Sequence, residues 1–419
     1  MIITNARVFL DGRFKKATFR VNNGVFTDIF CESGTEAEAA GASSAASCPE
    51  PEPGEEVIDC GGDRIIPGLF DIHTHGCLGH DFTVSSAEED MEMLREYASR
   101  GVTSVLATTM TSAPDTYRRA CGEIHRLSGK LSSEQRTSRE NVAAPHIPAH
   151  LRGINAEGPF LSLEKKGAHD PQYVTPPDEE YFNELNSLSG GIIRLITIAP
   201  ELEGAMDFIK KHTAVGNPET GCPAGLYLSV GHSDCDYTTA MEAFKAGSDH
   251  VTHRYNAMNG IHHRKPGIPC AAGDSNAWVE LICDGLHVHE SVIRHTFRAY
   301  PGRVVMISDS IAPTGLPDGE YVAGGLPATM KNGEIRLKDG TLAGSSTPLF
   351  EGLRRCITRF GIPEEEAILA ATYNPAASVG MTDRCGRISE GLDADFLVLG
   401  PTFNLTAVYL SGTKLPPRT

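Results

Sequence analysis

The chain has 419 residues and a formal charge of −17, from 37 basic and 54 acidic side chains. This negative charge disfavours polyanionic partners, so we expect neither nucleic acid nor a membrane surface to bind. The hydrophobic share of 40% is ordinary for a globular protein. No uncharged apolar run approaches the roughly 18 residues of a membrane span. The charged N-terminal residues predict no signal peptide.

The cysteines indicate the compartment. There are eleven of them, scattered from Cys31 to Cys385 and never spaced as Cys-x-x-Cys. This spacing predicts neither a disulfide framework nor a zinc finger. We therefore expect the protein to reside in a reducing cytoplasm.

The N-terminal segment predicts a small β unit. Apolar and polar residues alternate over 2–8, the chain turns at Asp11 and Gly12, and the alternation resumes over 19–29. Residues 32–63 are rich in Ala, Ser, Pro and Glu and include nine acidic residues but no Lys or Arg. We expect a loop or a partly disordered insertion there. Without those nine charges the rest of the chain carries −8, so the overall acidity does not exclude an anionic substrate.

The long central part of the chain predicts repeated βα units, because short apolar runs alternate with amphipathic stretches such as 87–100 and 202–212. Eight units favour an α/β fold of the (β/α)8 TIM-barrel type, here over residues 65–379. Residues 347–360 and 363–372 have helical patterns. Strand patterns at 386–399 and 405–414 predict that 380–419 completes the β unit of 1–64. The candidate barrel strands are 65–75, 102–109, 151–158, 192–201, 226–233, 250–258, 279–287 and 303–310.

Several of these strands end in residues that bind metal or transfer protons, and barrel enzymes place their active sites at the carboxyl ends of the strands. The first strand ends in His73 and His75, which face the same side because they are two residues apart. The third, fifth and sixth strands end in Glu157, His232 and His253. One carboxylate and two imidazoles suit Zn²⁺ or Fe²⁺ with a position left open for water.

The eighth strand ends in Asp309, an acid that could take a proton from water and pass it to a leaving group. Each residue also has a structural interpretation: Glu157 as a helix N-terminal acid, His232 or His253 as a core histidine, and Asp309 as a loop cap. Their shared position at successive strand ends favours the active-site interpretation.

A set of motifs in a defined order carries a family resemblance. These are PGLFDIHTHG (67–76), EGPF (157–160), KKGAH (165–169), APE (199–201), GHS (231–233), THRYNAM (252–258), HHRKPG (262–267), DGLHV (284–288), SDS (308–310) and LAGSS (342–346). Over nearly the whole chain they resemble the N-acetylglucosamine-6-phosphate deacetylases of the amidohydrolase superfamily. The resemblance implies a (β/α)8 barrel with a small β-sandwich built from both chain ends. It also implies hydrolysis of the acetamide of N-acetyl-D-glucosamine 6-phosphate, in amino-sugar catabolism.

The resemblance also implies roles for individual residues: Glu157, His232 and His253 as metal ligands, Asp309 as the proton-transferring acid, and His287 as a substrate contact. Arg264 suits a phosphate chemically, although a solvated basic turn over 262–265 is the alternative. In similar enzymes this arginine reaches across a dimer interface, which implies a homodimer. The positions that match the sugar-phosphate pocket are Ala168, His169, Asn256, Ala257, Arg264, Leu342, Ala343 and Gly344.

Three features leave the metal content and the substrate preference open. Some family members lack the first-strand histidine pair and hold one metal, whereas His73 and His75 are present here, so we expect one or two divalent ions per subunit. Mixed ligands accept Zn²⁺, our first expectation, or Fe²⁺, Mn²⁺ or Co²⁺. Arg254 and Ser310 stand where an apolar and a smaller residue are usual, which leaves fine substrate preference open.

Two other functions remain open. The first is a related amidohydrolase that acts on another N-acetylated amino-sugar phosphate or on a small amide. Dihydroorotases and hydantoinases carry a carboxylated Lys at the end of strand four, where this chain has Ile198 and Ala199 and no Lys. The second is a non-catalytic barrel that has kept the fold for assembly. Such a protein would have lost metal ligands, and none is missing here.

Overall fold

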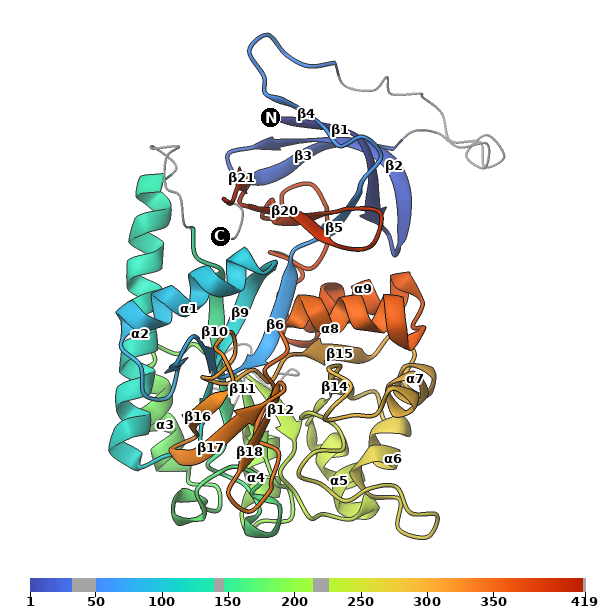
Figure 1. Ribbon diagram of the computed structural model, residues 1–419. Coiled ribbons are helices and arrows are strands. Elements are labelled where there is room, and N and C mark those ends of the chain that lie inside the picture. Colours follow the sequence, from blue (N-terminus) through green and yellow to red (C-terminus); the bar gives the residue numbers. More distant parts are fainter. Residues whose placement is uncertain (32–49, 139–146, 214–225, 417–419) are drawn as a thin grey trace.

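The computed structural model describes residues 1–31, 50–138, 147–213 and 226–416. Its centre is a parallel sheet of eight strands whose neighbours follow chain order from β6 to β15 (Figure 1). The amide of Asp309 donates to the carbonyl of His73 at 2.9 Å, and the amide of His75 donates to the carbonyl of Ser310 at 2.7 Å. These bonds join the last strand to the first, and the predicted (β/α)8 barrel is confirmed. Its strands are β6 (Leu69–Thr74), β9 (Val102–Met110), β10 (His150–Glu157), β11 (Ile193–Ile198), β12 (Tyr227–Val230), β13 (His250–Val251), β14 (Trp278–Ile282) and β15 (Val304–Ile307).

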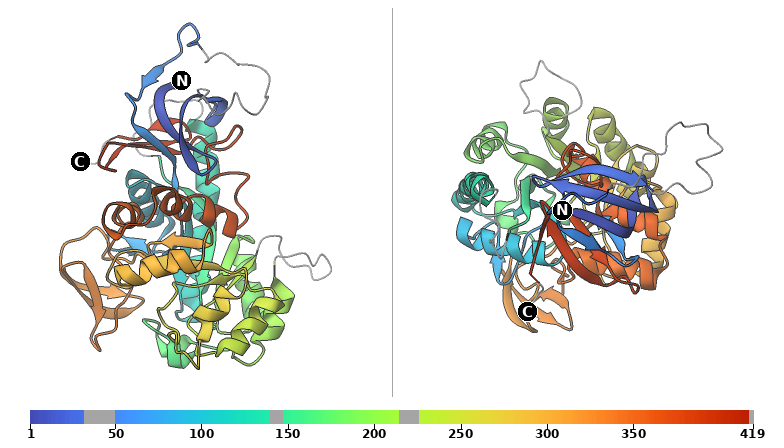
Figure 2. Two further views of the ribbon diagram at one scale, coloured as in Figure 1. Left: turned by 90° about the vertical axis from the view of Figure 1, so that its right-hand side faces the viewer. Right: turned by 90° about the horizontal axis from the view of Figure 1, so that it is seen from above.

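Amphipathic helices cover the outside of the barrel (Figures 1 and 2). The first, α1 (Ala87–Ser99), begins with a capping box in which the Ser86 hydroxyl accepts from the Glu89 amide and the Glu89 carboxylate accepts from the Ser86 amide. Its buried face includes Met91, Leu94 and Ala98, the helical repeat that the sequence predicted. The other helices are α2 (Pro114–Ser138), α3 (Glu179–Leu188), α4 (Ala205–His212), α5 (Tyr237–Ala246), α6 (Gly267–Gly273), α7 (Glu290–Ala299), α8 (Leu349–Arg355), α9 (Glu364–Ala371) and α10 (Tyr373–Ser378), with a π-helix over Cys356–Phe360 after α8 and 3₁₀ turns at Leu163–Lys165 and Pro171–Tyr173.

Both chain ends meet in a second sheet at the amino ends of the barrel strands, as predicted (Figure 1). The ring of Phe19 on β2 lies 5.4 Å from that of Phe396 on β19, although β1 and β5 separate these strands in the sheet. The sheet therefore folds over a core of its own, which gives the expected sandwich. Its strands are β1 (Ile2–Leu10), β2 (Arg13–Asn22), β3 (Val25–Cys31), β4 (Val57–Asp59), β5 (Arg64–Pro67), β19 (Phe396–Leu399), β20 (Leu405–Leu410) and β21 (Thr413–Lys414).

Several sequence predictions of element bounds were wrong in detail. The single strand expected over 65–75 is divided: β5 pairs with β1 and β19 in the terminal sheet, and β6 begins the barrel. Residues 57–59 of the expected loop form β4, which pairs with β1, whereas residues 32–49 lie outside the described part of the chain. In the region 386–399 only β19 is a strand. Five barrel strands, β11 to β15, end three to seven residues earlier than predicted.

A three-stranded sheet that the sequence did not predict follows β15. It consists of β16 (Gly319–Ala323), β17 (Leu326–Lys331) and β18 (Glu334–Leu337) and lies beside the carboxyl ends of the barrel strands (Figure 1). Ala323 and Met330 pack there with Ile311 and Ala343 in a separate apolar cluster. Next to β6, the short strands β7 (Gly76–Cys77) and β8 (His80–Asp81) pair with each other. No helix among the described residues combines the length and the apolar character that a membrane span needs.

Candidate active site

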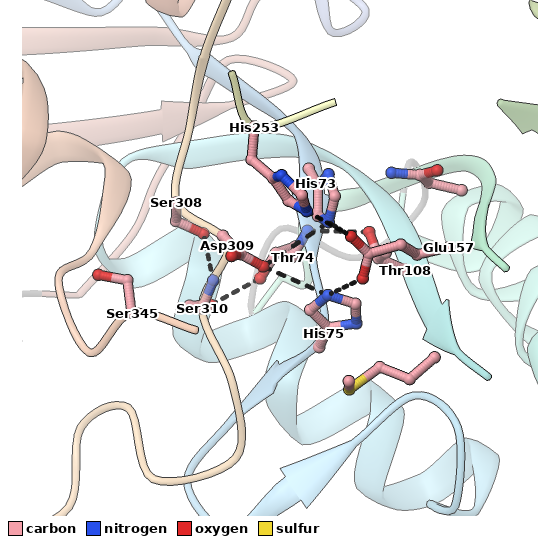
Figure 3. Close-up of polar contacts among 12 residues, drawn as sticks. His73, Thr74, His75, Thr108, Glu157, His253, Ser308, Asp309, Ser310 and Ser345 are labelled. Atoms are coloured by element: carbon pink, nitrogen blue, oxygen red, sulfur yellow. Dashed lines mark hydrogen bonds and ion pairs between the residues drawn. The ribbon is translucent and has the colours of Figure 1, made fainter. Parts of the chain in front are cut away.

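Glu157, the last residue of β10, lies at the centre of a buried group of imidazoles (Figure 3). Its Oε1 is 2.8 Å from Nε2 of His253, 3.1 Å from Nε2 of His232 and 3.3 Å from Nε2 of His73. Its Oε2 is 3.1 Å from Nε2 of His75. Burial raises the pKa of Glu157, but the surrounding histidines outweigh burial and hold the pKa well below its ordinary value. The structure therefore brings together all five predicted metal ligands.

Asp309 approaches the same group from the end of β15. Its Oδ1 lies 3.3 Å from Nε2 of His75 and 3.6 Å from Nε2 of His73. Burial raises the pKa of Asp309, but the hydrogen bond from His75 and the charge of His73 more than offset it, so the pKa lies below the ordinary value. Asp309 is therefore a carboxylate that can accept a proton.

Hydrogen bonds on the far side of two rings set the orientation of the imidazole lone pairs. Nδ1 of His73 lies 2.9 Å from Oε2 of Glu280, and Nδ1 of His232 lies 2.8 Å from the carbonyl oxygen of Lys165. Both acceptors hold a proton on Nδ1, so a cation that displaces the Nε2 proton meets a lone pair on each ring, directed toward Glu157. Nε2 of His232 is also only 3.0 Å from Nε2 of His253. Lone pairs and carboxylate oxygens that converge in this way fit a divalent cation.

His169 is also close to Glu157 but differs in its hydrogen bonding. The amide of Thr111 donates to Nδ1 of His169 at 3.3 Å, so the proton resides on Nε2, which lies 3.3 Å from Oε2 of Glu157. Burial and the neighbouring His232 lower the pKa of His169 to about 4. His169 is therefore a neutral hydrogen-bond donor to Glu157, although its position alone would allow it to join a metal-binding group with Glu157 and His232.

Three of the site residues adopt a strained backbone conformation. His232, His253 and Asp309 have φ values of 46°, 23° and 50°, in a region that non-glycine residues rarely enter and that costs about 1–3 kcal/mol per residue. Neighbouring elements hold them there. The amide of Ser162 donates to the carbonyl of His232, and the amide of Ser345 donates to that of Asp309. This strained backbone explains why β12, β13 and β15 end earlier than the sequence pattern predicts.

The predicted substrate residues line one cavity beside Glu157 and Asp309, with one exception. His287 is oriented by a 2.7 Å contact between its Nδ1 and Oδ2 of Asp284. Arg264 does not line the cavity of its own chain; it lies on the exposed turn 262–265 and contacts His263. The expected residues in the cavity wall are Ala168, His169, Asn256, Ala257, His287, Leu342, Ala343 and Gly344.

Glu280 is a functional candidate that the sequence reasoning missed. Its side chain is fully buried on β14, and its Oε2 accepts both from Nδ1 of His73 at 2.9 Å and from the amide of His253 at 3.1 Å. Oε1 has no hydrogen-bond partner among the described residues. The available signal was a single acid within the apolar run 278–282. Glu280 therefore supports two of the predicted metal ligands, His73 from the first barrel strand and His253 from the end of the sixth.

A second group of potential ligands lies at the opposite end of the barrel and has a simpler explanation. His150, Asp393 and Asp395 place ligand atoms close together. Arg152, however, contacts Asp393 at 2.7 Å, and His150 contacts Asp395 at 3.2 Å. These contacts pair both carboxylates and join β10 to the chain segment that leads into β19, so this group is an ion-pair network between the two sheets.

Comparisons with known proteins agree with this geometry. The model of the amidohydrolase family matches residues 64–415. N-acetylglucosamine-6-phosphate deacetylases from Vibrio furnissii and Bacillus subtilis are 32% and 33% identical, over 85% and 83% of this chain and 84% of each relative. N-acetylgalactosamine-6-phosphate deacetylase from Escherichia coli O157:H7 is 30% identical over 85% of this chain and 89% of its own length.

Among solved structures, a mutant of N-acetyl-D-glucosamine-6-phosphate deacetylase from Mycobacterium smegmatis, in complex with N-acetyl-D-glucosamine-6-phosphate, superposes with a TM-score of 0.83. The identity is 25%, and the match covers 99% of this chain and 98% of the other. The chain therefore belongs to the amidohydrolase family, a class of metal-dependent hydrolases. The relatives reported above, which match most of its length, are all deacetylases of N-acetylated hexosamine 6-phosphates.

Proposed function

We propose that this chain hydrolyses the acetamide of N-acetyl-D-glucosamine 6-phosphate to D-glucosamine 6-phosphate and acetate, in amino-sugar catabolism. The observation that carries the proposal is a buried carboxylate, Asp309, 3.3 Å from His75 in the candidate metal site, in a chain whose relatives reported above include deacetylases of this substrate. A non-catalytic barrel would have no use for such an ionised acid beside the cavity.

The residues fit a divalent metal because lone pairs of His73 and His232 converge on Glu157. In this proposal Glu157, His232 and His253 hold one ion, and His73 and His75 share Glu157 with a second. Zn²⁺ is the first choice, with Fe²⁺, Mn²⁺ and Co²⁺ as alternatives for this mixed ligand set. Such an ion, when bound, lowers the pKa of water and polarises an amide carbonyl.

The residues of the chain supply the proton transfers. Asp309, ionised at the start, accepts a proton from the attacking water while the water oxygen bonds to the acetyl carbonyl carbon. When the C–N bond breaks, Asp309 returns the proton to the departing amine nitrogen, so that the amine and acetic acid form, and the acid then loses its proton to become acetate. His287, whose Nδ1 faces Oδ2 of Asp284, uses Nε2 to accept a hydrogen bond from a sugar hydroxyl or, when Nε2 is also protonated, to donate one to the carbonyl oxygen.

Arg264 binds the phosphate in this proposal, and it does so from a second subunit. Two observations support this: Arg264 lies outside the cavity of its own chain and is exposed, and a guanidinium matches phosphate geometry. The protein is then a homodimer with shared sites. Its proposed domains are the catalytic barrel of 65–379 and the β-sandwich of 1–64 with 380–419, except that β5 extends the sandwich to Pro67. The nine cysteines within the described residues are all unpaired, which favours a cytoplasmic location.

The epimer N-acetyl-D-galactosamine 6-phosphate is the second candidate substrate, because a relative that matches 85% of the chain is named for it. The test is acetate release by metal-analysed protein from both phosphorylated sugars and from unphosphorylated N-acetylglucosamine. We expect the highest kcat/KM for the glucosamine compound. A higher value for the epimer would reassign the substrate. No release from any of the three after loading with Zn²⁺, Fe²⁺ or Mn²⁺ would refute the proposed function.

A further inference from the structure

Arg254 is an unusual buried cation directly behind the site. It follows His253 in the chain and is 1% exposed. No ion pair joins it to a carboxylate in the part of the chain that the structure describes, and its Nε has no hydrogen-bond partner there. A buried charge without a counter-ion is costly, so the interactions that hold this guanidinium must offset the cost.

Two tyrosines and one threonine hold the guanidinium. Its Cζ lies 4.1 Å from the ring centre of Tyr255 and 4.2 Å from that of Tyr300, so the cation is stacked between two π faces. Nη1 donates to Oγ1 of Thr296 at 3.0 Å and also to the hydroxyl of Tyr255. Thr296 and Tyr300 belong to the last turn and the C-cap of α7, where the helix dipole favours a positive charge. These contacts join α7 to the loop after β13, which spans residues 252–266.

That loop needs support because its backbone is strained. His253, Tyr255 and Ala257 have φ values of 23°, 82° and 48° within five residues, and none is a glycine. The loop also carries three groups that face the cavity: the imidazole of His253, Asn256 and Ala257. If the loop relaxes, Nε2 of His253 moves away from Oε1 of Glu157, at present 2.8 Å distant.

We propose that Arg254 is a positioning residue that holds this loop against α7 and so sets both the metal affinity and the substrate affinity of the site. It touches neither the cavity nor the carboxylates of the site, and it acts through His253 on the metal side and through Asn256 and Ala257 on the sugar side. The substrate part of this inference rests on the proposed function; the metal part does not.

The test uses Arg254→Leu and Arg254→Lys in the full-length protein, with Co²⁺ as the metal probe. We expect Arg254→Leu to weaken Co²⁺ binding, followed by visible absorption, at least about tenfold, and to raise KM at least about fivefold. Arg254→Lys keeps the positive charge but loses the planar guanidinium and its paired N–H donors. Its Co²⁺ affinity and its KM should therefore lie between those of Arg254→Leu and wild type.

The matched control is Arg303→Met. Arg303 also contacts the ring of Tyr300, at 5.5 Å, and bonds to main-chain carbonyls, but none of its contacts involves the loop after β13. The Arg303→Met variant should have a lower Tm than wild type, but its Co²⁺ affinity and its KM should stay within about twofold of wild type. Equal shifts in Arg303→Met and Arg254→Leu, or an unchanged Co²⁺ affinity in folded Arg254→Leu, would overturn the inference.

If Arg254→Leu fails to fold, Thr296→Val removes one of the two acceptors of Nη1 while keeping the shape of the side chain. It should weaken Co²⁺ binding in the same direction by at least about threefold, and wild-type affinity in this variant would contradict the proposal. A wild-type protein that binds Co²⁺ but releases no acetate would refute the proposed function and leave the Co²⁺ comparison as the test of Arg254.

Discussion

The carboxylate of Glu280 offers a direct test of how the site is built. Its Oε2 accepts two hydrogen bonds, from Nδ1 of His73 at 2.9 Å and from the amide of His253 at 3.1 Å. Glu280→Gln keeps an oxygen acceptor and the side-chain shape but removes the negative charge. A hydrogen bond to a charged group contributes about 1.5–3 kcal/mol and a neutral one about 0.5–1.5 kcal/mol, so each bond loses about 1 kcal/mol. The total is about 2 kcal/mol of the interactions that orient two ligands.

Ligand orientation has its full effect only when an ion is bound, so this loss should appear in metal affinity. About 2 kcal/mol corresponds to about 30-fold, within the roughly 10–100-fold range for groups that support metal ligands. The assay is competition between the protein and a chelator of known affinity for Zn²⁺. Asp395→Asn is the control, because Asp395 is an equally buried carboxylate next to His150 at the other end of the barrel. It should lower the Tm without changing Zn²⁺ affinity. A Zn²⁺ affinity of Glu280→Gln within twofold of wild type would show that Glu280 does not support the ligands.

Three more predictions address separate parts of the protein. Asp309→Asn should lower kcat at least about a hundredfold while the protein still binds Zn²⁺ through Glu157, His232 and His253; near-normal turnover would exclude Asp309 as the base. Arg264→Ala should raise KM for the phosphorylated sugar far more than for N-acetylglucosamine, and equal increases would exclude a phosphate role. Asp90 is fully buried on α1, where burial and then the nearby Asp81 and Glu123 raise its pKa to about 8. Its folded-state pKa lies above the unfolded value, so its contribution to the free energy of unfolding falls by up to about 1.4 kcal/mol per pH unit as the pH rises from about 4 to about 8. Chemical denaturation should therefore show Asp90→Asn gaining stability over wild type across that range; parallel curves for the two proteins would contradict the raised pKa.

The sequence alone determined the architecture and most of the site. Strand starts were predicted to within about one residue for seven of the eight barrel strands, since alternating apolar runs and amphipathic stretches report directly which residues are buried. It also predicted His73, His75, Glu157, His232, His253 and Asp309 as site residues, because each is a polar residue at the end of an apolar run, and the structure brings them together. In a parallel barrel such ends must converge.

Only the tertiary structure decided how those ends are shaped. His232, His253 and Asp309 leave the strand conformation at positive φ, which no apolar pattern reports. Hydrogen bonds to distant residues hold them there: Ser162 for His232, Glu280 for His253 and Ser345 for Asp309. The division between β5 and β6 and the sheet β16–β18 depend on pairing between distant segments. Glu280 lies within β14 and Arg254 lies shortly after the end of β13, and at both positions sequence periodicity predicts only that the side chain is buried. Their roles arise from what barrel closure places beside them: His73 from the first strand for Glu280, and two tyrosine rings for Arg254.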